Sequence, residues 1–173
     1  MPNERSTLRE ELQQTRPFHS AAHEALLSIL RTSAIVQRQV AQVVEPSGVT
    51  IQQYNVLRIL RGAGEAGLPT LAIRDRMIDE AAGITRLLDR LEDARYVLRE
   101  RSIPDRRQVM CRITEAGLAL VAALDAPVDD AQSRALSTLT LDEQQQLIAL
   151  LAAVRAGYAE RAPVADPVDD ARM

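Results

Sequence analysis

The sequence predicts a mainly α-helical fold that carries one small β-hairpin. Alanine and leucine dominate the composition and aromatic residues make up only 2%, a mixture that favours helices over a β-sandwich or barrel. Apolar residues recur at steps of three and four along several segments, whereas one stretch reads strand, turn, strand. With 173 residues, of which 46% are hydrophobic, the chain can bury a sizeable core in one compact domain with appended helices.

A first long helix is expected over residues 18–44, because its apolar residues follow the helical period. These residues are Ala22, Leu26, Ile29, Leu30, Val36, Val40 and Val43. Pro46, Ser47 and Gly48 should end the helix. The polar stretch before it, residues 1–16, is compatible with either a short helix or a disordered arm.

A second helix is expected to begin after Thr50 and to run to about Arg61. Thr50 followed three residues later by Gln53 forms the capping-box pattern. The glycine-rich run at residues 62–67 lacks the lysine and the hydroxyl side chain of a phosphate-binding loop. We interpret this run as a linker and not as a nucleotide site.

Two short helices joined by a tight turn are expected next, which is a helix-turn-helix. Leu68 and Pro69 can form a short edge strand ahead of the first of them, residues 70–77. Asp79 is placed to cap the second, residues 80–94. The apolar face of this second helix consists of Ile84, Leu87, Leu88 and Leu91.

A β-hairpin with an arginine-rich tip follows. Residues 97–103 and 109–113 partly alternate apolar with charged side chains, and Pro104 and Asp105 between them supply turn chemistry. Beyond the hairpin, a long helix opens at residues 114–117.

The C-terminal part is expected to be helical with a loose end. Pro127 should put a kink or a break into the long helix. Thr140 and Glu143 form a capping box before the last helix. Beyond Glu160 the chain is rich in proline and aspartate, which favours a loose tail.

The charge distribution singles out the middle third of the chain. All 21 basic residues are arginine, and the formal net charge is −3. Residues 58–112 hold 12 arginines against 9 acidic residues, residues 1–57 are balanced, and residues 113–173 hold 4 arginines against 10 acidic residues. Attraction to phosphates depends on the local field more than on net charge, so this asymmetry suits a DNA-reading centre. Scattered ion pairs on helix surfaces are the alternative interpretation.

These motifs resemble the MarR (multiple antibiotic resistance regulator) family. The hairpin tip Asp105-Arg106-Arg107 and the string Ile113-Thr114-Glu115-Ala116-Gly117 are similar to the family's D-R-R, short strand and L-T-x-x-G. The strings at residues 85–92 and 50–57 also match, in the right order, over about residues 20–160. The resemblance implies a winged helix-turn-helix flanked by N- and C-terminal dimerisation helices, which binds double-stranded DNA as a homodimer and needs no cofactor.

Two positions depart from the family pattern. Relatives usually have glycine after the recognition helix, where this chain has Arg95, and a left-handed turn there would strain the arginine. The recognition helix begins Glu80-Ala81-Ala82-Gly83, where relatives often carry polar base-reading side chains. Direct base readout is therefore expected to be sparse.

The resemblance also assigns segments and a mode of action. Residues 18–45 and 115–160 should be dimerisation helices and residues 50–114 the DNA-binding domain, with flexible or partly helical tails at residues 1–17 and 161–173. A two-fold dimer would bind a pseudo-palindromic operator, mostly as a repressor that excludes polymerase, although activation stays open. The alternative is a winged helix used as a protein-interaction module, which would need no basic tip.

The recognition helix offers three candidate DNA contacts. Arginine can pair with guanine O6 and N7, so Arg86, with Thr85 beside it, is the first choice for a contact with a base or an adjacent phosphate. Arg90 lies one turn later. It either contacts phosphate or pairs with Asp89 or Asp93.

The wing tip offers three more. Arg107 could enter the minor groove of an A·T tract, where negative potential is concentrated, while Asp105 holds the loop. Arg106 could take a phosphate, and the sequence leaves open which of the two arginines points inward.

His19 and His23 stand four residues apart on one helix face. This spacing can bind a metal with a third ligand such as Glu24, but hydrogen bonding near the dimer interface or a ligand pocket is favoured, and no metal is expected. Together with Arg31 and Arg58, these histidines are candidate contacts for the small aromatic or anionic effector that the resemblance implies.

Enzymatic and membrane functions have little support. The chain has two histidines and one cysteine, and it lacks the G-x-S-x-G and H-E-x-x-H motifs. No apolar run approaches the length of a membrane span and no signal peptide opens the chain, so a cytosolic protein is expected. Cys111 lies in a wing strand, away from the first helix where the family's peroxide sensors keep their cysteine, so a redox switch is not expected.

Overall fold

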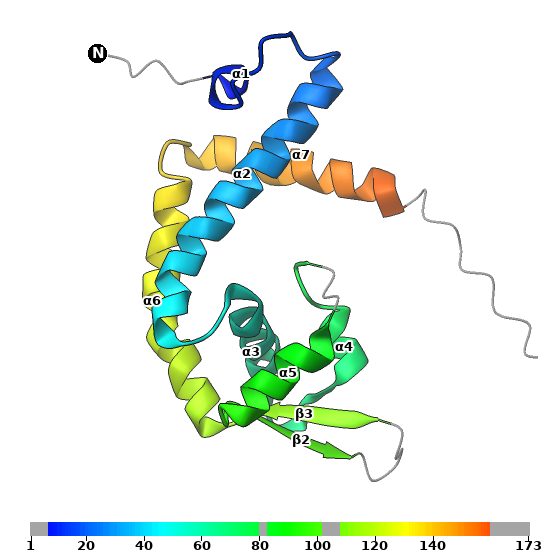
Figure 1. Cartoon of the computed structure of the whole chain (residues 1–173), viewed down its shortest axis with the longest axis vertical. Helices are drawn as coiled ribbons and strands as arrows, with labels where there is room; N and C mark the ends of the chain where they lie inside the picture. The colour runs from blue at the N-terminus through cyan, green and yellow to red at the C-terminus, as the bar shows by residue number, and fades with distance from the viewer. Residues whose placement is uncertain (1–6, 80–82, 102–107, 160–173) are drawn as a thin grey trace, which may run out of the picture. The chain divides into compact units, whose positions relative to one another are not determined.

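The structure is a computed structural model, and it describes residues 7–79, 83–101 and 108–159. The chain divides into two compact units, residues 1–132 and 133–173. Helices dominate both units, and the first also holds a small antiparallel sheet (Figure 1). The predicted fold class, mainly α with one β-hairpin, is therefore confirmed.

The N-terminal segment forms a short helix, α1 (Leu8–Glu11), which resolves the alternative that the sequence left open. The long helix α2 (Ala21–Val44) begins three residues later than predicted, because the side chain of Ser20 caps it by accepting a hydrogen bond from the backbone of His23. It ends in the short 3-10 helix η1 (Glu45–Ser47) and at Gly48, whose φ is 81°. The predicted stop is confirmed.

The helix α3 (Ile51–Ala63) has the predicted capping box. The Thr50 hydroxyl accepts from the Gln53 backbone at 3.2 Å, and the Gln53 side chain accepts from the Thr50 backbone at 2.8 Å. After the short η2 (Gly64–Ala66), the strand β1 (Leu68–Pro69) lies at the edge of the sheet, as predicted.

The two helices of the helix-turn-helix are shorter than predicted. The first, α4, covers Thr70–Arg74, and the second, α5, covers Ile84–Asp93. The prediction that Asp79 caps the second helix is wrong, because Gly83 is the N-cap with a φ of 107°, far from helical values. Residues 80–82 lie outside the described residues.

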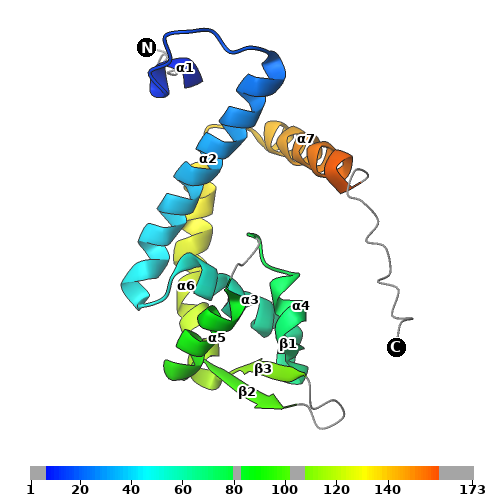
Figure 2. The same cartoon turned by 45° about the vertical axis from the view of Figure 1, so that its right-hand side comes forward.

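The sheet confirms the predicted hairpin. Strands β2 (Val97–Arg101) and β3 (Val109–Ile113) pair antiparallel, and β1 pairs with the other edge of β3, which gives the order β1-β3-β2. Both views place α5 beside β2 (Figures 1 and 2). The wing is defined here as residues 97–113, and its tip, residues 102–107, lies outside the described residues.

The helix α6 (Glu115–Ala135) runs without interruption through Pro127, so of the two predicted alternatives, a kink or a break, the break is wrong. Pro127 is exposed, whereas Leu124, Val128 and Ala131 stay buried along one face on both sides of it. That continuous burial holds the helix together although Pro127 cannot donate the usual backbone hydrogen bond. No helix in the described ranges is long and apolar enough to cross a membrane.

The second unit contains α7 (Leu141–Ala159), which begins with the predicted capping box. The Glu143 side chain accepts from the Thr140 backbone at 2.7 Å, and the Thr140 hydroxyl accepts from the Glu143 backbone at 3.3 Å. The predicted loose tail beyond Glu160 lies outside the described residues.

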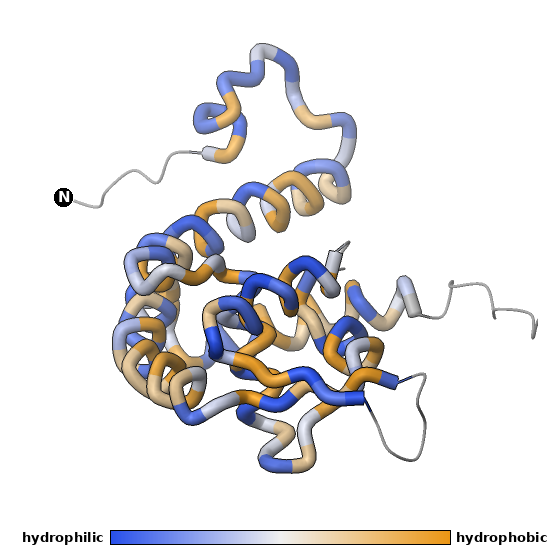
Figure 3. The backbone as a smooth tube through the Cα atoms, turned by 60° about the horizontal axis from the view of Figure 1, so that its bottom comes forward, coloured by the Kyte–Doolittle hydropathy of each residue, from blue (hydrophilic) through white to orange (hydrophobic). Residues whose placement is uncertain are grey.

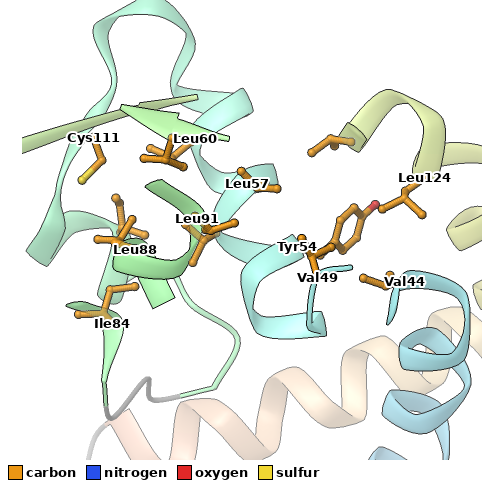
Figure 4. Packing of buried hydrophobic residues seen from close by; sticks show 14 of the residues in the cluster. Val44, Val49, Tyr54, Leu57, Leu60, Ile84, Leu88, Leu91, Cys111 and Leu124 are labelled. Carbon is orange, nitrogen blue, oxygen red and sulfur yellow. The ribbon is translucent and has the colours of Figure 1, made fainter. Parts of the chain in front are cut away.

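The core of the first unit lies where α3, α5, the sheet and α6 meet. Along the helices, hydrophobic and hydrophilic residues alternate as the backbone turns (Figure 3). Leu57, Leu60, Leu88 and Leu91 are completely buried, and Tyr54 of α3 points toward Leu124 of α6 (Figure 4). Val44 and Val49 continue the cluster to the end of α2.

Candidate DNA interface

The helix α5 presents two different faces. Ile84, Leu88 and Leu91 are buried, whereas Thr85, Arg86 and Arg90 are exposed. At 3.6 residues per turn, Arg86 and Arg90 lie on successive turns of the side opposite the core. The structure therefore brings the predicted helix contacts together on one outward surface.

The N-terminal end of α5 suits an anion. Gly83 makes no side-chain cap, and the first turn, all of it described, carries no acidic side chain. The backbone N–H groups of a first turn lack partners within the helix, and the helix dipole adds positive potential there. Arg86 lies in this same turn.

Arg90 does not pair with either carboxylate that the sequence offered it. Among the described residues, no ion pair joins Arg90 to Asp89 or Asp93. Asp89 pairs instead with Arg99 of β2, at 2.7 Å between Oδ1 and Nη2. The guanidinium of Arg90 is exposed on the outward surface.

Arg99 is a residue that the sequence interpretation missed. Its Nη2 lies 2.6 Å from Glu92 Oε2, and its Nε donates to the same oxygen at 2.7 Å. The hydrogen bond to Glu92 raises the pKa of Arg99, burial opposes that rise, and the bond to Asp89 adds to it. The available signal was strand alternation, which puts Arg99 on the same face of β2 as the buried Val97.

The predicted wing-tip contacts Asp105, Arg106 and Arg107 lie outside the described residues. The wing strands that carry this tip hold two further exposed arginines, Arg101 and Arg112. Arg112 is tied within the first unit, because its Nη1 lies 2.7 Å from Glu100 and its Nε donates to the Glu65 carbonyl at 2.9 Å.

The turn after α5 adopts the left-handed conformation that the sequence analysis considered, and Arg95 has a φ of 62°. The backbone of Arg95 donates to the Glu92 carbonyl at 2.8 Å, and that of Tyr96 donates to the Leu91 carbonyl at 2.9 Å. This pair of bonds is the Schellman motif, which normally uses glycine at this position. The geometry of the motif is kept, and Arg95 is strained.

Thr114 and Gly117 explain why that turn holds. The Thr114 hydroxyl donates to the Arg95 carbonyl at 2.8 Å and accepts from the Gly117 backbone at 3.1 Å. A β-carbon on Gly117 would lie 2.5 Å from the Tyr96 carbonyl oxygen, so only glycine fits. The T-x-x-G string therefore joins the end of the recognition helix to the start of α6.

The four candidate effector residues do not form one site. His19 and His23 stack with ring centroids 5.4 Å apart and line a surface pocket of about 360 Å³. Arg31 and Arg58 do not line that pocket. Arg31 pairs with Glu11 at 3.5 Å, and the Arg58 guanidinium lies 5.9 Å from the centre of the Tyr54 ring.

Arg16 gives this pocket a positive charge. Its lining consists of Gln13, Gln14, Thr15, Arg16, Pro17, His19 and His23, without a carboxylate. The Nδ1 atom of His23 is buried and has no hydrogen-bond partner. Among the described residues, no group of three or more histidine, cysteine or acidic side chains could hold a metal ion.

A second, smaller pocket of about 70 Å³ was not anticipated from the sequence. It lies where α2 and the start of α3 meet the segment before α5, and it is lined by Gln37, Ile51, Gln52, Asn55, Met77, Ile78 and Asp79. These residues come from three separate segments, which no single motif could have linked.

Cys111 is completely buried in β3, and burial raises the pKa of its thiol. Its sulfur lies 3.9 Å from the Thr70 hydroxyl. A buried thiol of raised pKa is a poor nucleophile, which agrees with the expectation of no redox switch at this residue.

Comparisons with known proteins point to one family. A model described as MarR family matches residues 49–109. The crystal structure of a MarR transcription factor from Planctomyces limnophilus is 39% identical, with a TM-score of 0.61, and the match covers 78% of this chain and 98% of that one. An HTH-type transcriptional repressor of Mycobacterium tuberculosis is 28% identical over 123 residues, which are 71% of this chain and 87% of the relative.

One similar structure contains DNA. A mutant MarR from E. coli complexed with operator DNA is 25% identical, with a TM-score of 0.69, and the match covers 86% of this chain and 99% of that one. The relatives from Planctomyces limnophilus and Mycobacterium tuberculosis are named as a transcription factor and a transcriptional repressor, not as enzymes.

Proposed function

This chain belongs to the MarR family and is a DNA-binding transcription regulator, and from that premise we propose that it acts as a homodimeric repressor on a pseudo-palindromic operator. The observation that carries the proposal is the outward surface of α5, where Arg86 and Arg90 are exposed opposite the buried face. Two such helices, related by a two-fold axis and one helical turn apart, would enter successive major grooves.

The dimer in this proposal forms through the terminal segments, residues 18–45 and 115–160. Both α2 and α7 carry large exposed apolar side chains, among them Leu30 at 57% and Leu150 at 67% exposure. Contiguous exposed apolar surface usually marks an association site, and a second copy of the chain would cover it.

Six residues form the proposed contacts with DNA. Thr85 and Arg86 read bases or adjacent phosphates from the first turn of α5, and Arg90 contacts phosphate one turn later. At the wing tip, Asp105 holds the loop while Arg106 and Arg107 divide the phosphate and minor-groove contacts between them. A regulator of this kind works in the cytoplasm, where it meets the DNA.

A small anionic effector is part of the proposal. His19 and His23 would contact it in the pocket that Arg16 also lines, because cationic and neutral donors there face no carboxylate. Arg31 and Arg58 do not line the pocket, so they would affect the effector only through long-range electrostatic attraction. A ligand between the α1 region and α2 would change how α2 meets its partner helix.

The test is an electrophoretic shift with DNA from the chain's own upstream region. Wild-type protein should bind one segment far more tightly than random DNA, and Arg86→Ala should weaken that binding by about 1 to 3 kcal/mol. Arg9→Ala removes the same charge from α1, outside the proposed DNA contacts and dimerisation segments, and is the matched control, with no expected loss. Absence of binding to any upstream segment would instead favour the protein-interaction module.

A further inference from the structure

The strand β2 carries an arginine at an inward-facing position. Its register pairs Arg99 with Cys111 of β3, which is completely buried, and only 22% of the Arg99 side chain is exposed. An unpaired charge at such a position would be strongly unfavourable, so its acceptors must be supplied by the element that packs on this face of the sheet. That element is the recognition helix α5.

Arg99 takes both of its acceptors from α5. Its Nη2 lies 2.7 Å from Asp89 and 2.6 Å from Glu92, and its Nε also donates to Glu92. Asp89 and Glu92 are three residues apart, so the guanidinium bridges successive turns of the helix. A planar group held at three points fixes distance and rotation together, which a single exposed ion pair would not do.

The carboxylates that Arg99 binds lie beside the proposed DNA-reading surface. In helical order, Glu92 and Asp89 lie on the flank of α5 toward β2, and Arg86 and Arg90 follow on the outward side. Any rotation of α5 about its axis relative to the sheet would therefore break the bonds to Arg99 and turn Arg86 away from its position.

We propose that Arg99 is a positioning residue for DNA binding, which sets the distance and rotation between the recognition helix and the wing so that both reach one duplex together. The inference rests on the proposed function, because it assumes that α5 and the wing contact the same DNA. Without the contacts of Arg99 to α5, the wing would have to be positioned when DNA binds, and the entropy cost of that ordering lowers affinity.

The first test is a thermodynamic cycle on operator affinity. Arg99→Ala should weaken binding about tenfold in the wild-type background but less than about twofold in Asp89→Asn/Glu92→Gln, because its ion pairs with α5 are already absent there. The Asp89→Asn/Glu92→Gln variant alone should also bind more weakly than wild type. Arg112→Ala removes an ion pair from the same wing without touching α5 and should cost less than Arg99→Ala.

Two outcomes of the cycle would overturn the proposal. Equal losses from Arg99→Ala in both backgrounds, with a salt dependence reduced by about one charge per subunit, would mean that Arg99 contacts phosphate directly. Tighter binding by Asp89→Asn/Glu92→Gln would mean that Arg99 only neutralises two repulsive carboxylates. If Arg99→Ala does not fold, Arg99→Lys replaces it, because lysine keeps the charge but not the planar bridge, and an intermediate loss is expected.

The second test needs no DNA, so that it decides the inference even if the proposed operator binding fails. Backbone hydrogen exchange of the free protein should become about fivefold or more faster in both β2 and the last turns of α5 in Arg99→Ala. In Arg112→Ala, any change should stay within the wing and η2, whose Glu65 carbonyl Arg112 contacts, and should leave α5 unchanged. Unchanged exchange in α5 and β2 of Arg99→Ala would show that Arg99 does not position these elements.

Discussion

The winged part of the chain, with the buried face of α6 packed on it, buries its apolar residues very differently from the helices α2 and α7. Among the described residues, every large side chain that is completely buried lies between Val44 and Val128. The helix α2 contributes only Val44 and the partly buried Val40 and Val43 to the core, and the described part of α7 has no buried residue. The winged part therefore contains the interactions that fold it. The terminal helices have apolar surface that calls for a partner.

The largest difference between the two regions should appear in stability. Leu88→Ala removes a completely buried side chain of α5 and should lower the free energy of unfolding by about 3 kcal/mol, within a range of about 2 to 5. Leu150→Ala on α7, which is 67% exposed, should change the stability of dilute protein by less than about 0.5 kcal/mol. Chemical denaturation of both variants measures this.

If Leu150→Ala costs as much as Leu88→Ala even at high dilution, α7 is covered within a single chain. A cost that instead grows with protein concentration would place the cover in a second copy. In that case the winged part would bury its apolar residues within one chain, and α7 would bury them between two chains.

Association should fail when charge is placed on the exposed face of α2. Light scattering of the wild type should give about twice the 19.1 kDa mass of the chain. Leu26→Glu/Leu30→Glu should shift the dissociation constant at least about tenfold toward monomer, because carboxylates would be buried unpaired in the interface. Leu71→Glu, on an exposed site of α4, is the matched control and should stay dimeric. A monomeric wild type would contradict the proposed dimer.

Sequence reasoning succeeded where a signal is local. The capping boxes at Thr50 and Thr140 and the edge position of Pro69 follow from residues a few places apart, and the structure has all of them. The sequence-based prediction failed where the outcome depends on which residues are buried in the folded protein. Pro127 does not break α6 because residues on both sides of it are held in the core, which the sequence alone does not show.

The candidate site was predictable only in part. The spacing of Arg86 and Arg90 places them on one helix surface, so their exposure could be foreseen. The partners of Arg99 lie on another element, and their identity depends on how a strand packs against a helix. Likewise, the sequence favoured Asp79 as the cap of the second helix. The actual N-cap is Gly83, and its left-handed φ could not be predicted from the residue pattern alone.

A smaller effect is expected at the strained turn after α5. Arg95→Gly should raise the free energy of unfolding by about 0.5 to 1 kcal/mol, because glycine removes the left-handed strain but has a more flexible unfolded chain. Arg95→Ala keeps the β-carbon and is the control, with no expected gain. Thermal unfolding of both variants measures the change in stability. An equal gain in stability from Arg95→Ala would mean that the lost charge, and not the backbone conformation, causes the effect.

The smallest expected effect concerns the ion pair between α3 and α6. Arg61 Nη1 lies 2.6 Å from Asp125 Oδ2, and this hydrogen bond lowers the pKa of Asp125 below its ordinary value of 3.8. A carboxyl whose pKa is lower in the folded state stabilises the fold above its ordinary pKa, and that contribution disappears as the pH falls through the lowered value. Because 43% of the Asp125 side chain is exposed, solvent screening keeps the contribution small. Denaturant titrations of wild type and Asp125→Asn between neutral pH and about pH 3 should therefore converge on acidification, with the wild type losing more stability. Parallel curves for the two proteins would mean that Asp125 titrates as it does in the unfolded chain, and that packing of Tyr54 against Leu124, without the ion pair, joins these two helices.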